Sequence, residues 1–149
     1  MSGPTLRTLF LAATLAFSAH AIADDDPRIE RQDLMKSVRE AAKPVGQMMR
    51  GDMDFDADTL MSSLETWLDV STKFGGLFPP GSESGEETEA APAIWTDREG
   101  FDKALAEWQT ATQAAIDAKP ASLEEARPIV GPVFNTCKGC HDNYRIEEE

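Results

Sequence analysis

The sequence is poor in cysteine and histidine, with two of each among its 149 residues. Two cysteines cannot build a disulfide-dense small fold, and so few thiols and imidazoles cannot supply a multi-cysteine zinc scaffold. Positive charge is also scarce, because 14 Lys and Arg face 27 Asp and Glu, for a formal net charge of −13. A chain this acidic repels phosphate backbones and anionic lipid surfaces, which argues against nucleic-acid binding.

The apolar run at Leu9–Phe17 is too short for a membrane-spanning helix, which needs about 20 residues. Arg7 precedes this run, and small residues follow it at Ala21-Ile22-Ala23 or, in a second frame, at Ala19-His20-Ala21. The pattern is typical of a secretory signal. It favours a cleaved signal over residues 1–23 rather than a retained N-terminal anchor.

Removal of residues 1–23 would leave a domain of residues 24–149. That segment contains Arg7 and no acidic residue, so its loss takes the net charge from −13 to −14. It also removes His20, which leaves His141 as the single histidine. We therefore expect an exported, soluble periplasmic protein with no membrane insertion after signal removal.

Strict apolar–polar alternation is missing, so no sheet is predicted. Apolar residues instead recur at steps of three and four in four segments, approximately 27–50, 57–74, 97–118 and 122–146. Four such helices predict an all-α, antiparallel four-helix bundle. Pro44 and Pro132 fall inside two of the helices, where each is expected to cause a kink.

The segments between the helices contain terminating signals. Thr96–Glu99 and Ser122–Glu125 each match a capping box ahead of a predicted helix. Residues Gly75–Pro92, rich in Gly, Pro, Ser and Glu, are expected to form one long exposed connection between the second and third helices. We refer to Gly75–Pro92 below as the interhelical connection.

One motif in the chain points to specific chemistry. Cys137-Lys138-Gly139-Cys140-His141 has the C-x-x-C-H spacing of c-type haem attachment. On a helical turn, two thiols three residues apart can each reach a vinyl group along one porphyrin edge, and the adjacent imidazole can then lie under the iron. The motif predicts one covalent haem c, with thioethers at Cys137 and Cys140 and His141 as the axial iron ligand.

Three alternative roles for the two cysteines fit the sequence less well. A thioredoxin-like site requires a βαβ context, a zinc site requires about four ligands, and a disulfide across three residues of a helix would be strained. A different class, a haem-free helical interaction module, is consistent with the acidic surface and the long connection. A haem that survives acid-acetone extraction would exclude that class.

A haem motif near the C-terminus of a secreted four-helix chain resembles the class II c-type cytochromes, above all the cytochrome c prime family. Four segments in order resemble that family: Arg31-Gln32-Asp33-Leu34-Met35, Phe78-Pro79-Pro80-Gly81-Ser82, Pro92-Ala93-Ile94-Trp95 with Phe101, and Cys137 to Arg145. The resemblance extends over nearly all of residues 24–149.

The resemblance implies roles by position. Arg31 and Gln32 match positions near the haem propionates, and Arg145 matches a basic residue on the proximal face. Met35 matches the residue that faces the distal side of the iron. Apolar or aromatic positions of the distal pocket are matched by Phe78, Phe101 and Trp108.

Met35 leaves two electronic types open. The resemblance implies a five-coordinate iron with an unligated distal side, which would bind small gases such as nitric oxide and carbon monoxide and could transfer single electrons. The alternative is a low-spin, six-coordinate electron carrier in which Met35 is the sixth ligand. An enzyme is not expected, because the single remaining histidine is assigned to iron.

The charge and the resemblance also suggest partners. A net charge of −14 would favour docking to a redox partner with a basic patch. This docking would weaken as the salt concentration rises. The family often dimerises through its first two helices, and Met48, Met49 and Met61 are apolar positions that we expect to be exposed there.

Overall fold

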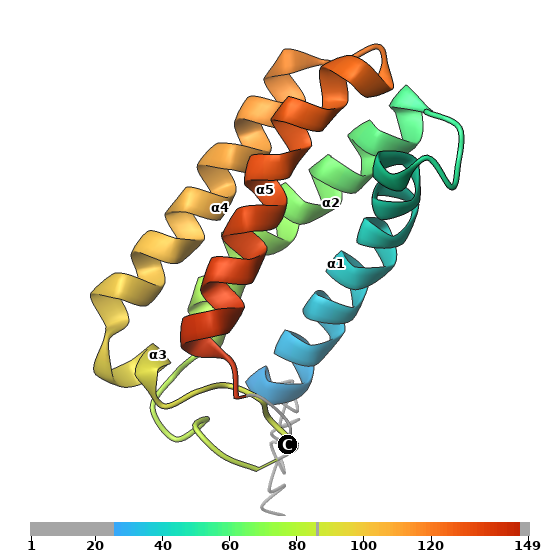
Figure 1. Ribbon diagram of the computed structural model, residues 1–149. Helices are drawn as coiled ribbons and strands as arrows, with labels where there is room; N and C mark the ends of the chain where they lie inside the picture. Colours follow the sequence, from blue (N-terminus) through green and yellow to red (C-terminus); the bar gives the residue numbers. More distant parts are fainter. Residues whose placement is uncertain (1–25, 86, 147–149) are drawn as a thin grey trace, which may run out of the picture.

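The computed structural model describes residues 26–85 and 87–146. The predicted signal, residues 1–23, and the tail 147–149 lie outside the described residues. Four long helices form the bundle: α1 (Pro27–Arg50), α2 (Ala57–Phe74), α4 (Arg98–Ala118) and α5 (Leu123–Tyr144) (Figure 1). Two short helical turns, η1 (Gly75–Leu77) and α3 (Ala93–Thr96), lie between α2 and α4. The predicted all-α four-helix bundle is confirmed.

The helix ends show why the predicted boundaries were close. Helix α1 begins after Asp26, whose carboxylate accepts from the Arg28 N–H at 2.9 Å, and ends at Gly51 in a left-handed conformation with φ of 81°. Helix α2 begins after Asp56, whose carboxylate accepts from the Thr59 N–H at 2.7 Å. These caps are local in sequence, so the sequence pattern is sufficient to find them.

Two predicted boundaries are corrected by the structure. Helix α4 is capped by Asp97, which accepts from the Gly100 N–H at 3.2 Å, and not by Thr96. Helix α5 ends at Tyr144 and not at 146, because Arg145 forms an isolated antiparallel bridge with Ala90. Within residues 26–85 and 87–146 this bridge is the only β-pairing. Helices α1 and α5 are continuous through Pro44 and Pro132.

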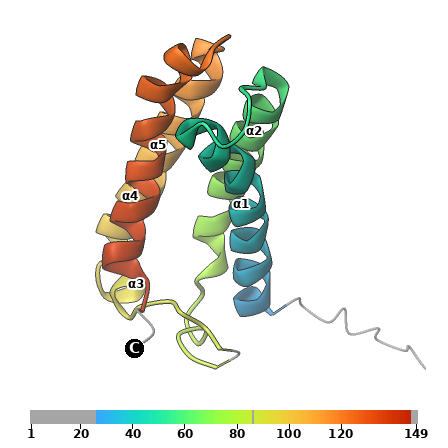
Figure 2. The same ribbon diagram turned by 45° about the vertical axis from the view of Figure 1, so that its right-hand side comes forward.

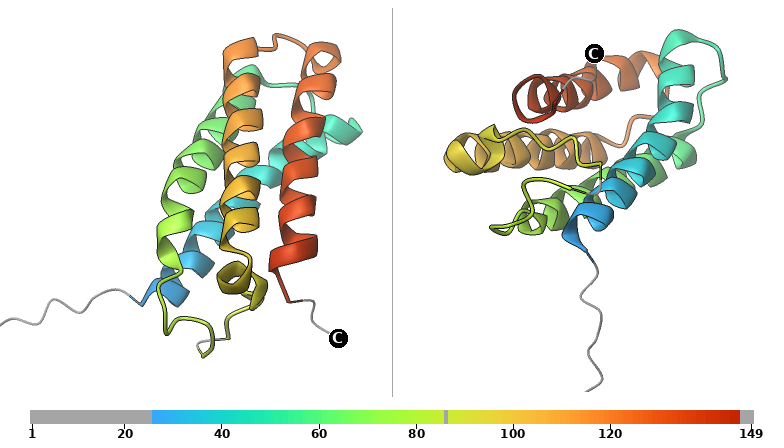
Figure 3. Two further views of the ribbon diagram at one scale, coloured as in Figure 1. Left: turned by 90° about the vertical axis from the view of Figure 1, so that its left-hand side faces the viewer. Right: turned by 90° about the horizontal axis from the view of Figure 1, so that it is seen from below.

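The bundle has a tightly packed end and an open end. Figure 2 shows the α1–α2 pair and the α4–α5 pair close together at the upper end and further apart at the lower end. Figure 3, left, shows α1 running obliquely to the other long helices. Buried residues that belong to the packed end include Val45, Met48, Leu60, Leu64, Ala115, Ala126 and Val130. The open end contains a cavity, so Met35 and Val38 of the α1 stripe, which line it, are only half-buried.

The interhelical connection is less exposed than predicted. Phe78 is 5% and Ser82 is 4% exposed, because this segment folds back over the open end of the bundle and packs there. The Ser82 N–H donates to the Pro79 carbonyl at 3.2 Å and closes a turn. The predicted long exposed loop is therefore wrong at these two positions.

The expectation that Met48 is exposed is also wrong. Met48 is 0% exposed, and its sulfur accepts a hydrogen bond from the Asp56 N–H at 3.2 Å in the turn between α1 and α2. Met49 and Met61 are half-buried. Among the described helices, none is long and apolar enough to cross a membrane.

Candidate cofactor site

The three residues of the haem-attachment motif lie on one face of the last turns of α5. Cys137 and Cys140 are half-buried free thiols, and both line the cavity at the open end of the bundle, as does His141. Burial raises the pKa of the Cys137 thiol, and burial with the neighbouring Cys137 raises the pKa of Cys140 to about 11. Both thiols are therefore protonated at neutral pH and face an interior space.

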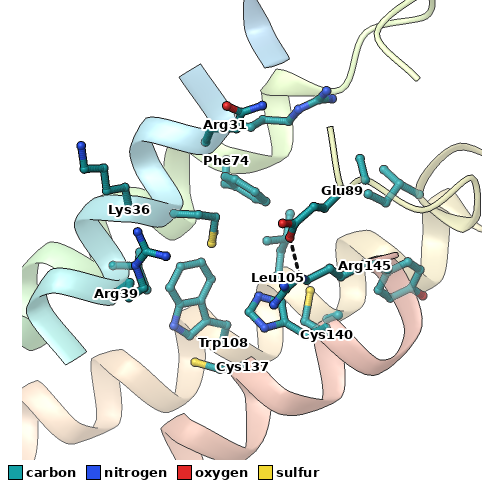
Figure 4. A pocket seen from close by; sticks show the side chains of 18 of the residues that line it. Arg31, Lys36, Arg39, Phe74, Glu89, Leu105, Trp108, Cys137, Cys140 and Arg145 are labelled. Carbon is teal, nitrogen blue, oxygen red and sulfur yellow. Dashed lines mark hydrogen bonds and ion pairs between the residues drawn. The ribbon is translucent and has the colours of Figure 1, made fainter. Parts of the chain in front are cut away.

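That cavity has a volume of about 690 Å³ and is bounded by α1, α2, α4, α5 and the interhelical connection. This volume lies within the range of sites that enclose a drug-sized molecule or cofactor. In Figure 4, Lys36 and Arg39 extend from α1 on one side, opposite Cys137 and Cys140 of α5. The cysteines thus face α1 across the cavity.

His141 lies at the mouth of the cavity, with part of its surface exposed to solvent. Burial of the ring, and then the Arg145 cation, lower the pKa of the imidazole from 6.5, while Glu89 and Asp142 act in the opposite direction. The neutral form is therefore favoured, and a neutral imidazole has the lone pair that an iron ligand requires.

Arg31 lines the cavity, but its charged end is directed into the interhelical connection. One terminal nitrogen donates to Leu77 O and Ser82 Oγ, both at 3.2 Å, and the other donates to Ser82 O at 2.9 Å and Thr88 Oγ1 at 3.2 Å. Only its Nε–H is then left for another acceptor. Burial lowers the pKa of this guanidinium, with a second contribution from Arg28. Arg31 is 4% exposed.

Gln32 and Met35, predicted from the same segment, also line the cavity. Gln32 is exposed at the rim, whereas Met35 is half-buried and packs against the core. Both types of iron coordination considered for Met35 are compatible with this position.

Two of the predicted aromatic residues, Phe78 and Phe101, belong to a connected group of rings on the cavity wall. The Phe78 and Phe101 rings meet edge to face with centroids 4.9 Å apart, and Phe101 meets Tyr144 in the same way at 5.4 Å. Trp108 is 7% exposed and lines the cavity, and its indole N–H has no hydrogen-bond partner among the described residues. Buried donors in folded proteins nearly always have an acceptor, so an unpaired indole N–H on this wall fits a cavity that holds a bound group.

Sequence reasoning missed two residues of the site. Glu89 lines the cavity, and its carboxylate pairs with Arg145 Nε at 2.5 Å (Figure 4). The Tyr144 hydroxyl donates to Asp97 Oδ2 at 2.9 Å and joins α5 to the start of α4. Both contacts join residues far apart in the sequence, so no local pattern could reveal them.

The residues present fit a covalent haem. The thiols lie one helical turn apart, the pKa of the adjacent imidazole is lowered, and the cavity is largely apolar with an indole donor that has no partner among the described residues. Within the described residues no group of three or more His, Cys, Asp or Glu side chains could hold a bare metal ion.

Fold and site together define the class of protein: a four-helix bundle with a c-type haem-attachment site at the end of its last helix. The sequence matches the family model described as Cytochrome C′ over residues 26–145. The chain therefore belongs to the cytochrome c′ family, and this membership implies a c-type haem as its cofactor.

Individual relatives agree with this assignment. Cytochrome c′ of Rhodopseudomonas palustris is 35% identical over 133 residues, which cover 88% of this chain and 89% of the relative. A solved structure of cytochrome c′ from that organism gives a TM-score of 0.81 at 33% identity, over 84% of this chain and 99% of the other. A nitric oxide complex of a cytochrome c prime variant from Alcaligenes xylosoxidans gives a TM-score of 0.71 at 26% identity, over 81% and 94%.

Proposed function

We propose that this chain is an exported, non-enzymatic haem protein that binds small uncharged gases at a five-coordinate iron and exchanges single electrons. Thioethers at Cys137 and Cys140 would attach one haem, and His141 would bind its iron. When bound, the haem supplies a redox-active iron with one open coordination position. The observation that supports this proposal most directly is the largely apolar cavity between α1 and the α5 motif.

The side chains around the cavity favour uncharged diatomic ligands. On the α1 side the residue expected to face the iron is Met35, and Phe78, Phe101 and Trp108 close the walls. An apolar wall excludes water and offers little to a charged ligand, because a charge transferred there would lose its hydration. The nitric oxide complex of the Alcaligenes xylosoxidans protein supports the same class of ligand.

Carbon monoxide binding tests the gas-binding part. The protein should be produced in a host with a haem-attachment pathway, reduced, and titrated with carbon monoxide and nitric oxide while the absorption spectrum is recorded. We expect the ferrous spectrum to change with both gases and to saturate at one ligand per haem. A reduced, haem-loaded protein whose spectrum responds to neither gas would contradict the proposal.

A second function is favoured by one residue. Met35 lines the cavity, and a thioether is a competent sixth ligand that would raise the reduction potential. In that case the protein would be a low-spin electron carrier with His141 and Met35 as its axial ligands. The partner would then be another redox protein, and the net charge of the chain favours one with a basic docking patch.

Substitution of Met35 separates the two functions. If Met35 binds iron, the wild-type spectrum is low-spin and Met35→Ala converts it to high-spin. If iron is five-coordinate, both proteins are high-spin, and Met35→Ala changes only the affinity for gas. Met49→Ala provides the control, because Met49 is also a half-buried methionine of α1 but does not line the cavity.

A further inference from the structure

The ion pair between Glu89 and Arg145 has no role in the function proposed above. Arg145 follows His141 by one helical turn, and its backbone N–H donates to the His141 carbonyl at 3.2 Å. Its side-chain Nε donates to Glu89 Oε2 at 2.5 Å, across 56 positions of sequence. In Figure 4 this contact is drawn from Arg145, which directly follows α5, to Glu89 of the interhelical connection.

Backbone hydrogen bonds fix Glu89 at this place. The Ile146 N–H donates to the Glu89 carbonyl at 2.8 Å, and the Ala91 N–H donates to the Tyr144 carbonyl at 3.0 Å. These two bonds flank the bridge between Ala90 and Arg145. The interhelical connection therefore pairs with the chain just after the haem-attachment motif, and the ion pair lies at the centre of this pairing.

The other charges near the motif are arranged differently. Asp142 is bound by Lys138 at 2.5 Å on the exposed side of α5. Glu87 also lines the cavity, but it forms no ion pair within residues 26–85 and 87–146. Among the described acidic residues of the connection, Glu89 is thus the one that is coupled directly to a residue one turn after His141.

We propose that Glu89 is a positioning residue: it holds the Arg145 guanidinium beside the His141 turn and cancels its charge there. The inference rests on the proposed function, because it concerns an iron bound to His141. Through this contact the connection between α2 and α4 would set the charge on the proximal side of the iron.

The proposal predicts that removing the Glu89 charge and removing the Arg145 charge shift the reduction of the iron in opposite directions. Loss of the Glu89 charge leaves an uncompensated cation near the iron, which favours the reduced state. Loss of the Arg145 charge leaves an uncompensated anion, which favours the oxidised state. For a unit charge several ångströms away in a solvent-screened site, each effect corresponds to about a threefold change in the equilibrium constant for reduction.

The experiment is a redox titration of the haem-loaded protein at fixed pH and ionic strength. We expect Glu89→Gln to raise the equilibrium constant for reduction and Arg145→Gln to lower it, each by about threefold. Glu83→Gln is the matched control, since it removes the same charge from the same connection at an exposed residue that does not line the cavity, and it leaves the ion pair intact. It should produce a clearly smaller shift than Glu89→Gln.

Hydrogen exchange gives a second measurement that does not depend on haem chemistry. The amide protons of Ala91 and Ile146 should exchange about two- to fivefold faster in Glu89→Gln and in Arg145→Gln than in the wild type. The double variant should exchange at the same rate as each single variant. A role confined to stability would change these rates without opposite shifts in reduction.

Three results would overturn the proposal: equal redox shifts from Glu83→Gln and Glu89→Gln, shifts of the same sign from Glu89→Gln and Arg145→Gln, or unchanged exchange at Ala91 and Ile146. Failure of the proposed function would look different. It would appear in the wild-type protein, as the absence of covalent haem or of any response to carbon monoxide.

Discussion

At the scale of single residues, Arg31 is the side chain whose structural role differs most from the role expected of it. The family resemblance implies a position near the haem propionates. In the structure, the four N–H groups of its two terminal nitrogens donate to Leu77, Ser82 and Thr88. The guanidinium also lies 4.6 Å from the centroid of the Phe78 ring. Arg31 therefore holds the interhelical connection on α1, and only its Nε–H could reach a propionate.

Replacement of Arg31 should destabilise the protein strongly. Arg31→Gln removes a buried cation and leaves the Leu77 and Ser82 carbonyls without these donors, which should lower the free energy of unfolding by about 2–4 kcal/mol. Urea unfolding followed by circular dichroism measures the change. Arg39→Gln is the control: Arg39 is exposed on the same helix, and its replacement should cost less than about 0.5 kcal/mol. Equal losses in the two variants would contradict this role of Arg31.

At the scale of secondary-structure elements, the start of α4 is joined to the end of α5. Asp97 caps α4 through the Gly100 N–H and also accepts from the Tyr144 hydroxyl. A methyl group at Gly100 would collide with both the Asp97 carboxylate and the Tyr144 oxygen. Gly100 is therefore required by this junction and not by its own backbone conformation, and the sequence pattern alone could not have identified it.

Two glycine substitutions test that junction. Alanine normally stabilises a helix relative to glycine by roughly 0.5–1 kcal/mol, and Gly131→Ala in α5 should follow this rule because nothing lies within 4 Å of the new methyl group. Gly100→Ala should instead lower the free energy of unfolding by about 1–3 kcal/mol, because the collision breaks the cap and the Tyr144 contact. Thermal unfolding of both variants gives the comparison. Stabilisation by both would show that the junction yields without cost.

The four helices could be predicted because their signals are local. The three- and four-residue spacing, Asp26 with Pro27, Gly51 and Ser122 all act within one or two turns of the helix they begin or end. The interhelical connection could not be predicted in the same way. Its Gly, Pro and Ser content indicates an exposed loop, but Arg31 of α1 and Tyr144 of α5 supply its hydrogen-bond partners from distant positions.

At the scale of the whole molecule, packing is uneven along the bundle. The end that contains Val45, Leu64, Ala115 and Val130 has a closed apolar core. The other end surrounds a cavity of about 690 Å³, where Trp108 has an unpaired N–H among the described residues. A cofactor would complete this second half of the core, because apolar walls without a partner lose both contacts and burial. Stability should therefore differ between the two ends when haem is absent.

Hydrogen exchange of haem-free protein, produced without the attachment pathway, checks this difference. We expect amides near Val45, Leu64 and Val130 to keep most of their protection. Amides near Phe101 and along the motif turn at Cys137 should exchange at least about tenfold faster than in the haem-loaded protein. Uniform loss of protection across both ends would show instead that the bundle folds as one unit that requires haem throughout.

The sequence by itself determined the helices and the family, and it predicted the attachment chemistry at Cys137, Cys140 and His141, because spacing, capping residues and motif order are all properties of short segments. Tertiary structure decided which side chains face the cavity, that the charged end of Arg31 is occupied by the interhelical connection, that Met48 is buried, and that Glu89 meets Arg145. These contacts join positions far apart in the chain, and their geometry depends on how obliquely α1 crosses the other helices. That angle results from the packing of all four helices together, so no single segment encodes it.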